Sequence, residues 1–194
     1  MTRPAWILAA LGALAALGAS SFARPTPRWI WNASASVPEG LYRLQPAATV
    51  QVGDLVAAAP PEPLASFLAA RRYLPRDALL LKHVAALPGQ NICRAGLTVR
   101  IDGARAGEAL PRDRRGRRLP DWQGCRTLAH GEVFLMNHAI SDSLDGRYFG
   151  ALPAESLLGR AAPIWLRPAA DAPRLGRHAV SAFPASTATG DPKP

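Results

Sequence analysis

Two residues of this sequence have the types that a serine–lysine catalytic pair requires. Lys82 lies in the segment of residues 79–87, which reads Leu-Leu-Leu-Lys-His-Val-Ala-Ala-Leu. Burial disfavours an ammonium ion, so an amine in such a segment becomes neutral closer to working pH. That amine could then take the proton of the Ser36 hydroxyl as its oxygen attacks a peptide carbonyl. The Ser36 backbone N–H and the Ser34 hydroxyl are candidate donors to the resulting oxyanion.

Both residues also have ordinary structural interpretations. A lysine at a strand edge can pack its stem and keep its ammonium in water. A serine before Val-Pro, as at Ser36, is common in turns. Taken alone, neither Lys82 nor Ser36 establishes a dyad.

The two cysteines offer different chemistry. Cys93 and Cys125 could form one disulfide in an oxidising compartment, which would stabilise the fold by roughly 3–4 kcal/mol. The alternative is a cysteine nucleophile, although neither cysteine has an obvious histidine or a Gly-rich context. The cysteines and the four scattered histidines show no metal-ligand spacing. We therefore expect no metal and no cofactor.

The N-terminal segment indicates export. Residues 4–23 carry no charge, lie between Arg3 and Arg24, and are rich in Ala and Leu. A helix of this length could cross about 30 Å of hydrocarbon, so we expect a transmembrane anchor over residues 1–23. A cleavable signal peptide is the alternative, with Leu17-Gly18-Ala19 as its cleavage site. Either interpretation exports the rest of the chain.

The remaining elements indicate a mainly β fold. The chain has 19 Pro and 16 Gly in 194 residues, which favours short strands and turns. Short strands are expected within residues 41–44, 50–58, 79–87, 97–101, 131–136 and 161–166, with one short helix over residues 62–72. We expect an exposed connector over residues 24–35, one β domain over residues 24–166, and a disordered Pro/Ala-rich tail over residues 167–194.

The basic composition first suggests an anionic partner. The formal net charge is +9, and residues 112–118 read Arg-Asp-Arg-Arg-Gly-Arg-Arg. Such a run is more typical of a solvated loop than of an element that binds in a nucleic-acid groove. An anionic membrane surface suits it better, and no helix-turn-helix is recognisable, so we expect no nucleic acid.

Three motifs in order resemble the signal peptidase I family, and more closely its TraF-type branch of conjugative-transfer peptidases. Residues 36–42 read Ser-Val-Pro-Glu-Gly-Leu-Tyr and resemble the nucleophile segment of that branch. Residues 82–89 read Lys-His-Val-Ala-Ala-Leu-Pro-Gly and resemble its base segment. Residues 131–136 and 143–150, the second reading Ser-Leu-Asp-Gly-Arg-Tyr-Phe-Gly, resemble its last box. The resemblance spans roughly residues 5–166 and implies a signal-peptidase-like β domain.

By this resemblance Ser36 and Lys82 carry catalysis. Ser143 would orient the Lys82 amine, and Asp145 and Arg147 would pair to hold the walls of the site. A simple turn is the alternative for Asp145. The sequence departs from the family pattern at His83, at Gln90, and at residues 137–140, which read Asn-His-Ala-Ile. These departures affect residues that would support the catalytic pair and residues that would line the substrate site, but not the pair itself.

The implied function is maturation of an exported precursor on the periplasmic side of the bacterial inner membrane. The substrate would be a conjugative pilin subunit, trimmed by water or cyclised by its own amino terminus. One alternative is a general signal peptidase, and another is a non-catalytic membrane-tethered assembly factor. The sequence does not define the substrate or the oligomeric state.

Overall fold

The computed structural model describes residues 3–22, 27–47 and 49–168, and within them the fold is mainly β, as predicted. The larger sheet has seven strands in the order β1-β2-β11-β3-β4-β9-β10. Every neighbouring pair of strands in it is antiparallel. Its strands are β1 (Trp29–Asn32), β2 (Gly40–Gln45), β3 (Leu55–Ala58), β4 (Leu80–Ala86), β9 (Glu132–Leu135), β10 (Leu152–Pro153) and β11 (Leu157–Leu166).

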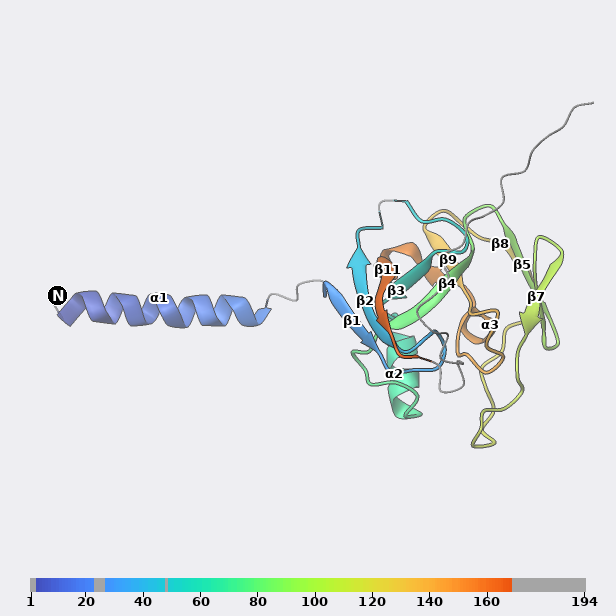
Figure 1. The fold of residues 1–194 in the computed structure, drawn as a ribbon, viewed down its shortest axis with the longest axis horizontal. Helices are drawn as coiled ribbons and strands as arrows, with labels where there is room; N and C mark the ends of the chain where they lie inside the picture. Colours follow the sequence, from blue (N-terminus) through green and yellow to red (C-terminus); the bar gives the residue numbers. More distant parts are fainter. Residues whose placement is uncertain (1–2, 23–26, 48, 169–194) are drawn as a thin grey trace, which may run out of the picture.

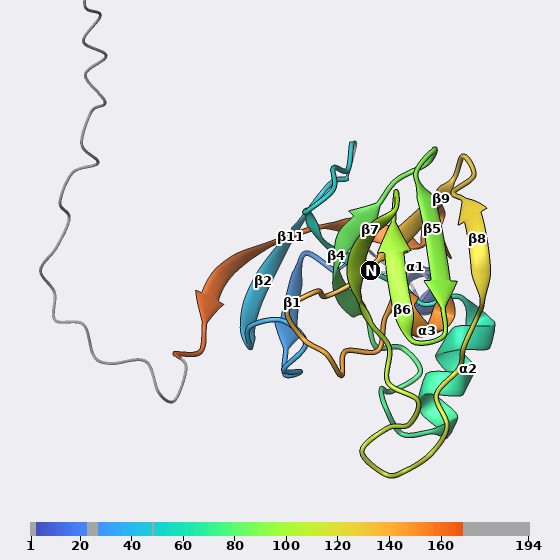
Figure 2. The same cartoon turned by 90° about the vertical axis from the view of Figure 1, so that its right-hand side faces the viewer.

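A second, four-stranded antiparallel sheet has the order β7-β6-β5-β8 and faces the viewer in Figure 2. Its strands are β5 (Asn91–Ala95), β6 (Thr98–Ile101), β7 (Ala104–Glu108) and β8 (Gly124–Thr127). The predicted hairpin at Asp102-Gly103 joins β6 to β7, with both turn residues at positive φ. Cys93 and Cys125 are directly opposite each other on β5 and β8 and form a disulfide.

Three apolar clusters hold these elements together. Helix α2 (Glu62–Ala70) packs Leu68 against one face of the larger sheet, where Leu80 and Val84 of β4 also lie. On the other face of β4, Ala85 belongs to a cluster with Ile92 of the smaller sheet. A third cluster includes Val37, Tyr42 and Leu81, and it supports the loop between β1 and β2. Strand β4 is therefore buried on both faces, which explains its nearly continuous apolar sequence.

The predicted transmembrane helix is not confirmed. Helix α1 (Arg3–Phe22) forms where the sequence predicted a helix, and Figure 1 shows it extending away from the β strands. Among the residues that the structure describes, however, no helix is long and apolar enough to cross a membrane. The physical reason is composition, because Ala, Gly and Ser occupy many positions of α1 and gain little from transfer into hydrocarbon.

Three other expectations need correction. Residues 24–35 are not only a connector, because β1 forms within them and pairs with β2. There is a second short helix, α3 (Gly146–Phe149), as well as a 3-10 turn, η1 (Ala154–Ser156). The expected strand over residues 50–58 is limited to β3, since residues 51–54 form a turn closed by the Asp54 carboxylate.

The predicted tail begins with two described residues. The Arg167 N–H donates to the Glu39 carbonyl at 2.8 Å, and the two side chains form an ion pair. The rest of the predicted tail, residues 169–194, lies outside the described residues. The start of the predicted tail is thus attached to the loop that leads into β2.

Candidate active site

The loop that carries Ser36 joins β1 to β2 and is held from within by Asn32. The buried Asn32 amide donates to the carbonyls of Ser34, Val37 and Pro38 at 2.8, 3.0 and 3.1 Å. The Tyr42 hydroxyl also donates to the Pro38 carbonyl, at 2.6 Å. One buried asparagine therefore satisfies several loop carbonyls and fixes the loop conformation. Sequence reasoning did not select Asn32.

Ser36 lies on this loop with its hydroxyl 3.0 Å from the Ser34 hydroxyl. Ser34 Oγ donates its only proton to Asn32 Oδ1 at 2.8 Å. Ser36 is therefore the donor in the contact between the two serines, because a hydroxyl has one proton to give. The predicted pair of Ser34 and Ser36 is brought together in this way.

Lys82 lies on β4 between Leu80 and Val84, on the same face of the strand, and its side chain is only 4% exposed. The Lys82 amine donates to Ser143 Oγ at 2.7 Å. Burial lowers the pKa of Lys82 from 10.5 to about 8, while the negative charge of Asp145 opposes this shift and Arg147 adds to it. The amine is thus neutral in a useful fraction of molecules near neutral pH.

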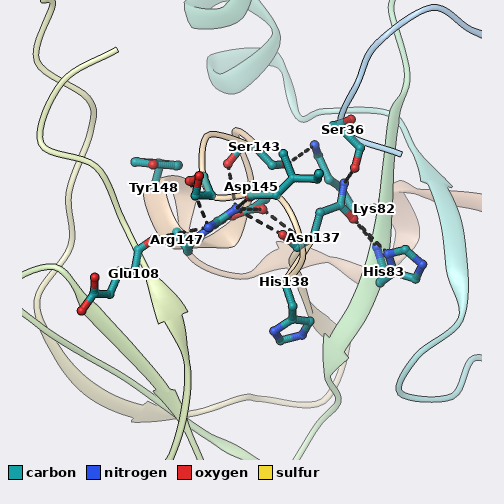
Figure 3. A network of polar contacts seen from close by, with 12 residues as sticks. Ser36, Lys82, His83, Glu108, Asn137, His138, Ser143, Asp145, Arg147 and Tyr148 are labelled. Carbon is teal, nitrogen blue, oxygen red and sulfur yellow. Dashed lines mark hydrogen bonds and ion pairs between the residues drawn. The ribbon is translucent and has the colours of Figure 1, made fainter. Parts of the chain in front are cut away.

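Lys82 and Ser36 do not share a hydrogen bond in the part of the chain that the structure describes. The Lys82 amine contacts Ser143, and the Ser36 hydroxyl contacts Ser34. Their segments are nevertheless adjacent, because the side chain of Asn137 donates to the carbonyls of both Ser36 and Leu81, at 2.7 and 3.3 Å (Figure 3). The loop that carries Ser36 and the strand that carries Lys82 therefore meet at one buried amide.

Asn137 follows β9 and is only 2% exposed. Its Oδ1 accepts the His83 backbone N–H at 3.1 Å and lies at the same distance from His83 Nδ1. Sequence reasoning noted residues 137–140 as a departure from the family pattern but assigned Asn137 no role. An asparagine directly after an apolar strand is a weak signal, since the partners that it contacts are distant in the sequence.

Asp145 and Arg147 form a buried ion pair, with side chains 0% and 2% exposed. The carboxylate is bidentate, accepting from Arg147 Nε and Nη2 at 2.9 Å each, and it also accepts the Asn137 N–H at 3.0 Å. Gly146 between them is required by space, because a Cβ there would lie 2.6 Å from the Phe134 ring. The Asp-Gly-Arg motif is therefore a structural unit and more than a surface turn.

The Arg147 guanidinium also orders the loop that precedes Ser143. Arg147 donates to main-chain carbonyls on the segment after β9 and at the end of β7, namely those of Asn137, Ile140, Ser141, Ser143 and Glu108. Arg94 of β5 in turn donates to the Arg147 carbonyl at 2.6 Å. The position of Ser143, and so of the acceptor for Lys82, depends on this buried arginine.

A cleft of about 920 Å³ opens beside Ser36. Its walls come from the Ser36 loop, from the turn before β3, from β4, from the segment that follows β9 and from the residues that follow β11. They include Val52, His83, Ile140 and Pro168. Within the described ranges, no three His, Cys, Asp or Glu residues are grouped to hold a metal ion.

The comparisons with known proteins identify the family. The model of the signal peptidase family, peptidase S26, matches residues 2–166. The chain belongs to this family. That membership confirms the resemblance drawn from the three motifs.

Several proteins similar to this chain are named for conjugal or plasmid transfer. The conjugal transfer protein TraF of Agrobacterium fabrum is 38% identical, over 69% of this chain and 80% of that protein. TraF of Agrobacterium tumefaciens is 36% identical, over 79% of this chain and 92% of that protein. The plasmid transfer protein TraF of Escherichia coli is 31% identical, over 69% of this chain and 80% of that protein.

Proposed function

We propose that this signal peptidase family member is a serine endopeptidase in which Ser36 is the nucleophile and Lys82 the general base. The observation that carries the proposal is the buried Lys82 amine, whose pKa is lowered to about 8 and which lies one hydrogen bond from Ser143. At pH 7 about a tenth of such amines are neutral, against well under a thousandth at the ordinary lysine pKa. A Ser–Lys dyad requires a neutral amine within reach of the nucleophile's hydroxyl. The Asn137 amide, bonded to the carbonyls of Ser36 and Leu81, keeps the Ser36 loop next to the strand of Lys82.

The proposed reaction begins when a peptide carbonyl in the cleft is attacked by Ser36 Oγ. The Ser36 proton passes to Lys82, and the carbonyl oxygen becomes an oxyanion stabilised by the Ser36 N–H and the Ser34 hydroxyl. For that role the Ser34 proton must turn from Asn32 Oδ1 toward the substrate. The tetrahedral intermediate collapses, Lys82 returns the proton to the leaving amine, and an ester remains on Ser36.

The ester can be resolved in two ways. Water, deprotonated by Lys82, would release a trimmed chain. The amino terminus of the substrate would instead form a new peptide bond and release a cyclic product, lighter than the trimmed chain by one water. We propose a conjugative pilin precursor as the substrate, as the resemblance of the three motifs to conjugative-transfer peptidases implies. The names of the relatives support a role in conjugal transfer.

We further propose that the enzyme works in the bacterial envelope, on the periplasmic side of the inner membrane. Its β1 and β11 strands present large exposed apolar side chains, including the stacked pair of Trp31 and Trp165 with ring centroids 5.7 Å apart. Tryptophan side chains favour the interface between lipid and water. This surface supports contact with a lipid bilayer close to the Ser36 loop.

The test is intact-mass spectrometry of the pilin-like precursor after co-expression with wild type, Ser36→Ala or Lys82→Ala. A trimmed mass that both variants lose would support the dyad, and a further loss of one water would support cyclisation. An unchanged precursor together with trimming of ordinary exported proteins would favour the second candidate, a general signal peptidase. Trimming that survives Ser36→Ala would refute the catalytic assignment.

A further inference from the structure

Asn137 connects the two halves of the proposed dyad and the ion pair behind them. Its side-chain amide donates to the Ser36 carbonyl and to the Leu81 carbonyl. Its side-chain oxygen accepts the His83 N–H. Leu81 and His83 flank Lys82, so the Asn137 side chain binds the main chain on both sides of the base.

The place of Asn137 in the sheet explains how one side chain can do this. Strand β9 pairs with β4 as far as Leu135, and the Met136 N–H donates to the His83 carbonyl at 2.9 Å. Beyond that point the Asn137 side chain supplies the acceptor and the donor that a further strand residue would supply to β4. Its amide thus replaces main-chain pairing beside Lys82 and still has a hydrogen to donate to the Ser36 carbonyl.

The orientation of the Asn137 amide is determined by its surroundings. The His83 N–H is a donor and must face Oδ1, whereas the carbonyls of Leu81 and Ser36 are acceptors and must face Nδ2. The Asn137 main chain is fixed as well, through its N–H to Asp145 Oδ2 at 3.0 Å and its carbonyl to Arg147. A buried, fully bonded amide of this kind has one orientation and one position.

The geometry points to Asn137 as the positioning residue that holds the Ser36 loop against the Lys82 strand. This inference rests on the proposed function, since it concerns the same dyad. The Ser36 carbonyl is fixed by Nδ2, which restrains the main chain of Ser36 and so the direction of its hydroxyl. Asn137 touches neither the substrate carbonyl nor the transferred proton in this role.

Two variants separate positioning from support of the fold. Asn137→Ala removes every side-chain bond. Asn137→Asp keeps the acceptor for the His83 N–H but places a carboxylate oxygen against the Ser36 carbonyl. Gln123→Ala is the matched control, because the Gln123 amide likewise bonds to both the N–H and the carbonyl of Gly96, on the smaller sheet.

The experiment is steady-state cleavage of the precursor by the full chain across pH 6 to pH 10, with thermal unfolding of each variant. Both Asn137 variants are expected to lose about 10²-fold in kcat on the high-pH plateau, with KM within about threefold of wild type. The midpoint of the pH profile should stay near that of wild type for Asn137→Ala and rise for Asn137→Asp, whose negative charge favours the Lys82 ammonium. Gln123→Ala should match wild type in kcat.

Different results would refute the Ser36–Lys82 dyad and the positioning role of Asn137. Cleavage that depends on Ser36 and Lys82 while folded Asn137→Asp keeps a plateau kcat within about threefold of wild type would overturn the positioning role only. A change confined to KM would overturn it too. If the Asn137→Ala variant does not fold, the plateau kcat of Asn137→Asp tests the positioning role by itself. Cleavage that is indifferent to Ser36→Ala would instead refute the dyad.

Discussion

Lys82 Nζ donates to Ser143 Oγ at 2.7 Å, although 61 positions separate the two residues in the sequence. Lys82 comes from the middle of a strand buried on both faces, and Ser143 from a loop held by the carbonyl contacts of Arg147. The hydroxyl of Ser143 gives a buried amine the polar partner that it needs. In the proposed mechanism this bond also directs the amine.

Ser143→Ala is expected to lower kcat by about 10- to 100-fold, because the Lys82 amine loses the acceptor that orients it. The measurement is precursor cleavage under saturating substrate. Ser141→Ala is the matched control, since Ser141 lies in the same loop and is exposed. Equal rates for the Ser143 and Ser141 variants would contradict an orienting role for Ser143.

The rate of cleavage should rise with pH through a midpoint near 8. The general base must be neutral, and the pKa of Lys82 is lowered to about 8 by burial. The fraction of active enzyme therefore increases tenfold per pH unit below that midpoint and levels off above it. A profile of kcat/KM between pH 6 and pH 10 checks this, and a rate that is flat across the range would exclude Lys82 as the base.

Lys82→Met should inactivate the enzyme and stabilise the fold. Because the folded-state pKa of Lys82 is about 8 and its ordinary value is 10.5, folding buries a charged amine below pH 8 and releases the Lys82 proton between pH 8 and pH 10.5. The full free-energy cost of burying the Lys82 amine therefore destabilises wild type below pH 8, and this cost decreases as pH rises from 8 to 10.5. We expect a gain of about 1–3 kcal/mol in the free energy of unfolding at pH 7.

Urea unfolding of both proteins at pH 7 and pH 10 tests the stability effect. The advantage of Lys82→Met should shrink at the higher pH, because at pH 10 the folded amine is neutral and part of the unfolded chains carry a neutral amine as well. An advantage that grows with pH would contradict the direction of the Lys82 pKa shift.

Arg147→Met should destabilise the fold by about 3–5 kcal/mol, because it leaves the buried Asp145 carboxylate and several main-chain carbonyls unpaired. Arg160→Met is the control, since the Arg160–Asp54 pair is 3.8 Å long and its arginine is 44% exposed. That surface variant should change stability by less than about 1 kcal/mol. Similar melting temperatures for the two variants would argue against the structural unit formed by Asp145 and Arg147.

Reduction of the Cys93–Cys125 disulfide should lower stability by about 3–4 kcal/mol, as expected for a cross-link between residues 32 positions apart. The paired Cys93→Ser/Cys125→Ser variant, compared with oxidised wild type by thermal unfolding, measures the effect. Because both cysteines lie on the smaller sheet, cleavage by the folded variant should stay close to wild type. Loss of activity without loss of stability would link the disulfide to the site.

Local patterns predicted much of the site and less of the fold. Residues 36–42, 82–89 and 143–150 were predicted from their resemblance to motifs of the family, each of which is contiguous in the sequence. Strand β8 was missed because its residues are exposed and polar, so no alternation marks it. The apolar stretch in α1 was predicted to span a membrane, but the hydropathy of its many small residues is too low.

The sequence by itself determined which residues are candidates for chemistry, that the domain is rich in short strands, and in what order the motifs follow. Only the tertiary structure decided that the buried amide of Asn137 links Ser36 to β4, across 101 positions of sequence. The physical reason is that periodicity and turn chemistry act between near neighbours in the chain. Contacts between distant segments depend on strand order and packing, which arise from the summed burial of many residues at once.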